Sequence, residues 1–165
     1  AQSKSYVKNY LKISDKKRNI LEIGCAHGSF LYEAKKFGCN VTGLEINNFL
    51  RSNLNKHFGI KCLKTISQLQ KEKIKFKKIF LFYSIEYFFN FKEDLISLQR
   101  MLEPMGEIII ITPNKNDIFN SIYSNKAYEN FFYDINSINY FSPKSINSLM
   151  KILNFKKYKI IVKQG

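Results

Sequence analysis

Short apolar runs of strand length alternate with stretches of helical periodicity along the chain. The apolar residues of Ile108–Ile111 stand at successive positions, which is typical of a strand covered by helices on both faces. Between such runs apolar residues recur at the helical spacing, as in Phe30, Ala34 and Phe37. This alternation predicts an α/β fold with a doubly wound, mostly parallel, Rossmann-like sheet. The strand-like runs are Asn19–Ile23, Asn40–Glu45, Ile60–Leu63, Lys78–Tyr83, Glu107–Thr112 and Tyr158–Val162.

Capping residues indicate where the intervening helices begin. Asn47 follows the second strand and is a good N-cap. Asn90, with Glu93 three residues later, resembles a capping box in which Asn replaces Ser or Thr. Ser142 followed by Pro143 predicts an N-cap with proline at the first helical position.

At 165 residues the chain has the length of one domain with a substantial core. No internal repeat, Pro/Gly-rich linker or low-complexity tail divides it. We therefore expect a single domain over residues 1–165, with an N-terminal helix within residues 1–17. Residues 113–141 form a long, aromatic and Asn-rich connection, the least regular part of the chain.

The net charge of +14 suggests nucleic acid as a partner, but the kind of cation argues against it. Only Arg18, Arg51 and Arg100 are arginines, the residue whose planar fork nucleic-acid sites favour. Lys, Asn, Ile, Phe and Tyr, which A/T-rich codons encode, are abundant, so genome composition accounts for much of the basicity. Nucleic-acid binding is thus an alternative that is not favoured.

Other features concern location and metal binding. No apolar run reaches the ~18 residues of a membrane span, and the first ten residues lack a signal-peptide core. We therefore expect no membrane span and a cytoplasmic protein. Cys25, Cys39 and Cys62 are odd in number and form no Cys-x-x-Cys pair, while His27 and His57 lie far apart. This pattern predicts neither a disulfide framework nor a metal site.

A turn of small residues follows the first strand, with Gly24, Ala26 and Gly28 at alternate positions. Small residues let the backbone approach a ligand, and the following helix offers unpaired N–H groups to an anion. Glu45 ends the second strand, where a carboxylate can accept hydrogen bonds from both hydroxyls of a ribose. The spacing differs from the dinucleotide fingerprint G-x-G-x-x-G. A tight strand–helix turn without a ligand is the alternative.

The turn, with Glu22 two residues before its first glycine, resembles motif I of class I S-adenosylmethionine (SAM)-dependent methyltransferases. Phe76–Tyr87 is similar to the fourth strand of small-molecule (type 11/23) families related to ubiquinone-biosynthesis enzymes. The later segments Leu98–Gly106, Ile108–Asn114 and Tyr140–Phe155 resemble, in order, the next helix and turn, the fifth strand, and the last helix with its turn into strand six. The resemblance covers roughly residues 19 to 162 and implies a class I methyltransferase fold whose last strand is missing.

The resemblance implies that SAM is the cofactor and S-adenosylhomocysteine (SAH) the product. It assigns the Gly24–Gly28 backbone and the end of strand four to the methionine part, and Glu45 to the ribose. It places Ile46, Thr65 and Ile66 beside adenine, without the aspartate often found after the third strand. The expected cofactor-binding residues are Glu22, Gly24, Cys25, Ala26, His27, Gly28, Glu45, Ile46, Thr65, Ile66, Tyr83 and Ser84.

A sulfonium methyl group is already activated, so transfer needs orientation and exclusion of water, and no metal. No catalytic residue is identified; the weak candidates for acid–base chemistry are Glu86, Tyr87 and His27. A solvated helix start or turn is the alternative role for each. Tyr87 stands where the family usually has His, and Lys77 where it usually has Asp.

We expect methyl transfer to O or N of a small-molecule acceptor, with residues 113–141 covering the site. The aromatic residues expected to form the acceptor pocket are Phe119, Tyr123, Tyr128, Phe131, Phe132, Tyr133 and Tyr140. An RNA or protein methyltransferase is one alternative, although strand four ends in Phe82-Tyr-Ser-Ile85 rather than an Asn/Asp-Pro-Pro-aromatic motif. A non-catalytic SAM-binding domain of the same fold is the other. No feature indicates the acceptor's identity or the oligomeric state.

Overall fold

The computed structural model describes residues 2–116 and 137–162. The chain forms two compact units, one of Ala1–Phe82 with Ser97–Ile110 and the other of Tyr83–Ile96 with Ile111–Gly165. Each unit is described by itself below. The expectation of a single domain over residues 1–165 stays a prediction.

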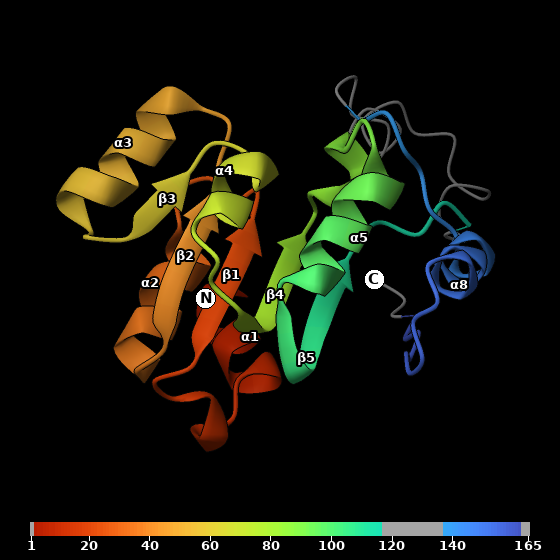
Figure 1. The fold of residues 1–165 in the computed structure, drawn as a ribbon, viewed down its shortest axis with the longest axis horizontal. Coiled ribbons are helices and arrows are strands. Elements are labelled where there is room, and N and C mark those ends of the chain that lie inside the picture. The colour runs from red at the N-terminus through yellow and green to blue at the C-terminus, as the bar shows by residue number, and fades with distance from the viewer. Residues whose placement is uncertain (1, 117–136, 163–165) are drawn as a thin grey trace. The chain divides into compact units, whose positions relative to one another are not determined.

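A five-stranded sheet in the order β3-β2-β1-β4-β5 forms the centre of the first unit (Figure 1). β1 pairs in parallel with β2 on one side and β4 on the other, and β2 pairs in parallel with β3. The reversal of strand order at β1 and the helices between strands confirm the doubly wound fold predicted from the sequence. The strands are β1 (Asn19–Ile23), β2 (Asn40–Leu44), β3 (Lys61–Leu63), β4 (Phe76–Phe82) and β5 (Leu102–Ile111).

The helices begin where the capping residues predict. The Asn47 side chain accepts hydrogen bonds from two backbone N–H groups of the next helix, and Ser142 caps a helix that begins with Pro143. The helix after Asn90 starts at the next residue. The helices are α1 (Gln2–Tyr10), α2 (Ser29–Phe37), α3 (Asn48–His57), α4 (Ile66–Lys71), α5 (Phe91–Arg100) and α8 (Pro143–Ile152), with 3-10 turns at Ile13–Asp15 and Ile85–Tyr87.

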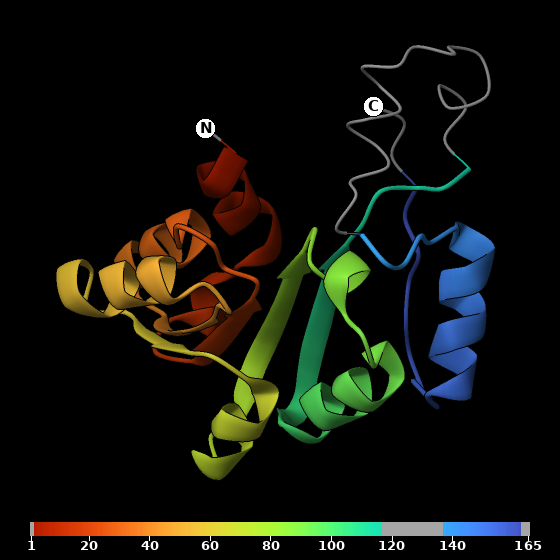
Figure 2. The ribbon, with the colours of Figure 1, turned by 90° about the horizontal axis from the view of Figure 1, so that it is seen from above.

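Aromatic packing against β4 holds α1 and α2 on one side of the sheet in the first unit. The ring of Phe30, in the first turn of α2, lies 4.7 Å from that of Phe80 and 5.1 Å from that of Phe82. Tyr6 of α1 stacks on Phe82 with ring centroids 4.4 Å apart. In Figure 2, α2 and α4 lie on opposite sides of the strands. Because Phe30 is anchored in this core, the start of α2 is fixed relative to the end of β1.

Two strand predictions were wrong. Residues 158–162 form no strand, and their side chains are exposed, which a strand of the sheet would not tolerate. β5 begins at Leu102 rather than Glu107, so it includes part of the segment expected to be a turn. Met105 has φ 59°, a left-handed conformation, and the chain bends there within β5. The predicted N-terminal helix within residues 1–17 is present as α1.

In the second unit, the segment after β5 lies beside the residues just before α8. The Lys115 N–H donates to the Phe141 carbonyl at 2.7 Å, and the Phe141 ring meets Phe91 of α5 edge-on. Most of the expected acceptor-covering segment 113–141 lies outside the described residues, as do six of its aromatic residues: Phe119, Tyr123, Tyr128, Phe131, Phe132 and Tyr133. That assignment stays a prediction.

Candidate functional site

The turn between β1 and α2 has the backbone conformation that its small residues allow. Gly24, Ala26 and Gly28 all have positive φ, at 70°, 46° and 68°. A Cβ at Gly28 would lie 2.3 Å from the Leu54 side chain, so only glycine fits there. Gly24 and Ala26 are exposed, whereas Cys25 between them is buried. The turn thus presents bare backbone at the carboxyl end of β1, as the sequence predicts for a ligand-binding turn.

Glu45 connects this turn to the start of α3. Its carboxylate accepts a hydrogen bond from the Ala26 N–H at 2.9 Å and another from the Asn47 N–H at 2.8 Å. Arg51 donates to the main-chain carbonyl of Glu45 at 2.8 Å. Only 7% of Glu45 is exposed, although the residue stands at the end of its strand. A side chain at the end of an interior strand is buried by the elements on either side of it.

The bonding pattern of Glu45 fits a ribose. A carboxylate offers about four lone-pair sites, two on each oxygen. One backbone N–H occupies each oxygen of Glu45, which leaves both oxygens able to accept from a hydroxyl. Two adjacent ribose hydroxyls match this arrangement, and the exposed backbone of Gly24 and Ala26 lies beside it.

The expected adenine residues differ in what they present. Ile46 is 75% exposed, and Phe49 in the first turn of α3 is 72% exposed. Sequence reasoning missed Phe49, although a large apolar residue just after an N-cap was a usable signal. Thr65 caps α4, since its hydroxyl accepts from the Gln68 N–H at 3.2 Å, and Ile66 is the first residue of that helix. Ile46 and Phe49 thus offer an apolar surface for a ring, whereas the side chain of Thr65 has a structural partner.

Glu22 is the one acidic residue within β1, and it is buried. Its Oε2 atom has no hydrogen-bond partner among the described residues. Burial, and to a lesser extent the charge of nearby Cys62, raise the pKa of Glu22 well above its usual range. A buried acceptor without a partner costs about 1–3 kcal/mol, which a donor supplied by a ligand would offset. This orphaned oxygen fits the expected site for the methionine part of SAM.

The second unit holds the residues that follow β4. Tyr83 has φ 50°, and the short 3-10 turn after it carries Glu86 and Tyr87. Glu86 is only 4% exposed, and its two carboxylate oxygens, like the hydroxyl of Ser84, have no hydrogen-bond partner of normal geometry among the described residues. Tyr87 is about half exposed. Buried polar atoms are thus concentrated just after the carboxyl end of β4.

Thr112, the residue after β5, adds to this polar cluster. Its hydroxyl is also buried without a normal hydrogen bond among the described residues. Burial raises the pKa of Glu86, and the neighbouring Thr112 hydroxyl offsets part of that rise. Sequence reasoning missed Thr112; a polar residue ending the run Ile108–Ile111 was the available signal. The main chain of Glu86 is held firmly, because its carbonyl accepts from the Ile138 and Asn139 N–H groups, both at 3.0 Å.

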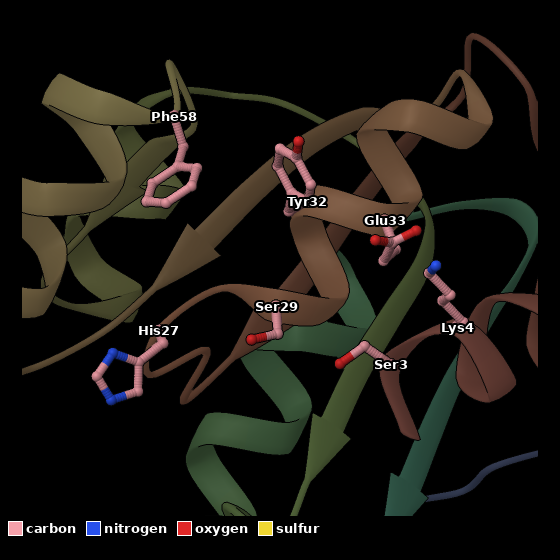
Figure 3. Close-up of a pocket in the computed structure, with 7 residues that line it drawn as sticks. All are labelled: Ser3, Lys4, His27, Ser29, Tyr32, Glu33 and Phe58. Carbon is pink, nitrogen blue, oxygen red and sulfur yellow. The ribbon is translucent and has the colours of Figure 1, made fainter. Parts of the chain in front are cut away.

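His27 lies on the wall of a separate, open pocket in the first unit. This pocket has a volume of about 330 Å³ and is formed by α1, the turn, α2 and the residue after α3 (Figure 3). Lys4 and Glu33 bring opposite charges into it. The residues that line it are Ser3, Lys4, His27, Ser29, Tyr32, Glu33 and Phe58. His27 is exposed there.

Within residues 2–116 and 137–162, no group of three His, Cys, Asp or Glu side chains is placed to hold a metal ion. Over the same ranges, no helix is both long and apolar enough to cross a membrane.

Comparisons with known proteins agree with this architecture. A family model described as a methyltransferase domain matches residues 2–160. A SAM-dependent methyltransferase from Archaeoglobus fulgidus has 19% identity and a TM-score of 0.73, with 92% of this chain and 67% of that chain covered. The plantazolicin methyltransferase BpumL, solved with a desmethylPZN analog and SAH, has 20% identity and a TM-score of 0.71, covering 94% and 62%. A possible histamine N-methyltransferase from Thermotoga maritima has 19% identity and a TM-score of 0.69, covering 94% and 70%.

These structures share the fold of this chain at low identity. No curated protein sequence matches the chain. The chain spans about two thirds of the length of the solved proteins, or slightly less. The match of the family model over nearly every residue decides the relationship: this chain belongs to the family of methyltransferase domains, has the class I methyltransferase fold, and has SAM as its cofactor.

Proposed function

We propose that this chain transfers a methyl group from SAM to an oxygen or nitrogen atom of a small-molecule acceptor. The family match over residues 2–160 is the observation that carries the proposal. Two structural relatives support the small-molecule part, since their names refer to plantazolicin and to histamine. SAM supplies an activated methyl group on its sulfonium.

In this proposal the residues after β1 and β2 bind the cofactor. The Glu45 carboxylate accepts from the ribose hydroxyls while it keeps its bonds to the Ala26 and Asn47 N–H groups. The exposed backbone of Gly24 and Ala26 lies against the methionine part, and the orphaned oxygen of Glu22 accepts from a donor there. Ile46 packs on adenine. The other residues that the sequence predicts for the cofactor site stay part of the proposal: Thr65, Ile66, Cys25, His27, Tyr83 and Ser84.

Glu86 is the proposed proton acceptor. A general base works best when its pKa lies near the working pH, and burial raises the pKa of Glu86 towards that range. Its carboxylate has no hydrogen bond of normal geometry among the described residues, and the Thr112 hydroxyl stands beside it. Tyr87 and His27, the other two candidates, are exposed. The cluster of Ser84, Glu86 and Thr112 therefore recognises a donor group, a hydroxyl or an amine, on the acceptor.

Calorimetry with SAH tests cofactor binding, with NAD⁺ as the control ligand. We expect a micromolar dissociation constant for SAH, which corresponds to about −8 kcal/mol, and no heat with NAD⁺. Tight NAD⁺ binding without SAH binding would refute the cofactor. A panel of small hydroxyl and amine compounds with methyl-labelled SAM then tests transfer. SAH binding without turnover of any small molecule, but with labelling of RNA or protein, would favour the alternative acceptors.

The role of Glu86 is tested with the acceptor that the panel identifies. Activity of the wild-type protein should fall as pH drops through the raised pKa, because the protonated carboxyl cannot accept a proton. Glu86→Gln should lower kcat at least about 100-fold, the usual contribution of a general base, and leave the SAH dissociation constant unchanged. Glu93→Gln, at an exposed position of α5, is the control. Full activity of Glu86→Gln would rule out the assignment.

A further inference from the structure

Two buried cysteines meet where the turn between β1 and α2, residues 24–28, packs on the sheet of the first unit. We call this segment the cofactor turn, after the proposed function. The Sγ atoms of Cys25, in the turn, and Cys62, in β3, lie 3.7 Å apart. Gly43 of β2 lies between them: a Cβ there would come within 2.7 Å of the Cys25 sulfur and 3.1 Å of the Cys62 sulfur. The missing side chain at Gly43 therefore leaves the space in which the two thiols meet.

The two thiols are not equivalent. The hydrogen bond from Cys25 lowers the pKa of Cys62, with help from the charge of Arg51 and against burial and the charge of Glu45. The same hydrogen bond and burial raise the pKa of Cys25. Cys62 is thus the sulfur that ionises first, and Cys25 is the protonated neighbour. A thiolate beside a second thiol is the arrangement in which oxidation leads on to a disulfide.

We propose that Cys25 and Cys62 are an oxidisable dithiol that closes to a disulfide with hydrogen peroxide and weakens cofactor binding. The Cys62 thiolate attacks one peroxide oxygen, the O–O bond breaks, and the departing oxygen leaves as water after it takes up a proton. Cys62 is then a sulfenic acid. The Cys25 sulfur attacks the Cys62 sulfur, the S–O bond breaks, and the hydroxyl leaves as water with the Cys25 proton. Two thiols and one peroxide become one disulfide and two waters.

Closure must move the cofactor turn. A disulfide bond is about 2.05 Å long, so the sulfurs must approach each other by about 1.7 Å from their present 3.7 Å. Cys62 is held in β3, where its N–H and carbonyl both bond to the side chain of Asn55 at 3.1 and 3.2 Å. Cys25 lies in the turn between exposed Gly24 and Ala26. The displacement therefore falls mainly on the turn.

The displaced turn carries a contact of the cofactor site. The residue after Cys25 is Ala26, whose N–H donates to Glu45 at 2.9 Å. A shift of the turn lengthens this bond and changes the position of the carboxylate proposed to bind the ribose. The effect on affinity rests on the proposed function, whereas formation of the disulfide does not.

Mass spectrometry of peroxide-treated protein tests the disulfide without any ligand. We expect the mass to fall by that of two hydrogens, one cross-linked peptide pair containing Cys25 and Cys62, and full alkylation of Cys39. Cys39 is the matched control, because it is also buried but bonds to the Asp15 carbonyl, away from the pair. A cross-link through Cys39, or two cysteines that stay reduced or go to higher oxides, would overturn the proposal.

Calorimetry with SAH tests the consequence. Peroxide should weaken SAH binding at least about tenfold in wild type and Cys39→Ser, and dithiothreitol should restore it. Cys62→Ala should bind SAH before and after peroxide alike, and if it fails to fold, Cys62→Ser replaces it. Unchanged affinity of the disulfide form would overturn the link to the cofactor. Failure of the untreated protein to bind SAH would instead contradict the proposed function.

Discussion

Replacement of Glu45 by alanine removes the hydrogen-bond acceptor shared by the cofactor turn and α3. The carboxylate bonds to the N–H groups of Ala26 and Asn47 at 2.9 and 2.8 Å, and little of the residue is exposed. Asn47 is also the N-cap of α3, so its backbone position decides where that helix begins. Glu45→Ala therefore affects the folded structure as well as any ligand.

The magnitude follows from these two bonds. A hydrogen bond to a charged group contributes roughly 1.5–3 kcal/mol. Ala26 and Asn47 are exposed, so in the variant water can bond to their N–H groups and offset part of the lost stabilisation. We therefore expect the free energy of unfolding to fall by about 2–4 kcal/mol. For a chain of this size, 1 kcal/mol corresponds to roughly 2–4 °C, so Tm should fall by about 4–16 °C. The lost ribose bonds should weaken SAH binding by about 1.5–3 kcal/mol, or roughly 10- to 150-fold.

Urea unfolding and calorimetry with SAH measure the two effects separately. Glu72→Ala is the control, since Glu72 pairs with Lys61 at the surface, and such pairs contribute only about 0–1 kcal/mol. A Glu45→Ala protein as stable as the control would refute the role of Glu45 in holding the turn. An unchanged dissociation constant for SAH would refute its role at the ribose.

Two further changes test packing and charge in the same unit. Gly43→Ala should lower the free energy of unfolding in urea by about 1–3 kcal/mol, because the new methyl group would press on the sulfurs of Cys25 and Cys62. A loss under about 0.3 kcal/mol would mean that the two thiols move aside freely. Glu22→Gln should stabilise the unliganded protein at pH 8 and not at pH 4. Since burial raises the folded pKa of Glu22, the folded state holds a proton more tightly than the unfolded chain, and stability falls as pH rises from about 4.3 through the folded value. Parallel Tm profiles of the variant and wild type against pH would contradict this.

The fold was predictable where a local signal and the tertiary structure agree. β1 has the predicted bounds, since the apolar run Asn19–Ile23 ends at a glycine that must adopt a positive φ. Asn47 and Ser142 cap their helices as expected, because a capping bond involves only residues two or three positions away. The Gly24–Gly28 turn also depends on a local signal, its small residues with positive φ. The candidate site could therefore be predicted from the sequence.

The wrong predictions depend on contacts that no local pattern contains. Tyr158–Val162 has the composition of a strand, but a strand exists only where a neighbour pairs with it. The start of β5 was placed too late, because Pro104 and Gly106 indicate a turn, whereas the left-handed φ of Met105 lets the strand continue past them. The Cys25–Cys62 contact joins residues far apart in sequence across Gly43, and spacing rules detect only nearby cysteines. The burial of Glu45 likewise depends on the elements on both sides of β2.

Four residues that contradict ordinary folding preferences occur near or just after the carboxyl ends of β1 and β4. Ala26 after β1 and Tyr83 after β4 have positive φ, which costs a non-glycine residue of order 1–3 kcal/mol. Glu22 near the end of β1 and Glu86 after β4 bury carboxylate oxygens without partners among the described residues. At each of these positions, glycine or an apolar residue would make the unliganded protein more stable. In an open α/β sheet the carboxyl ends of the strands are where ligands bind, so these costs fall where our proposal places the cofactor and the acceptor.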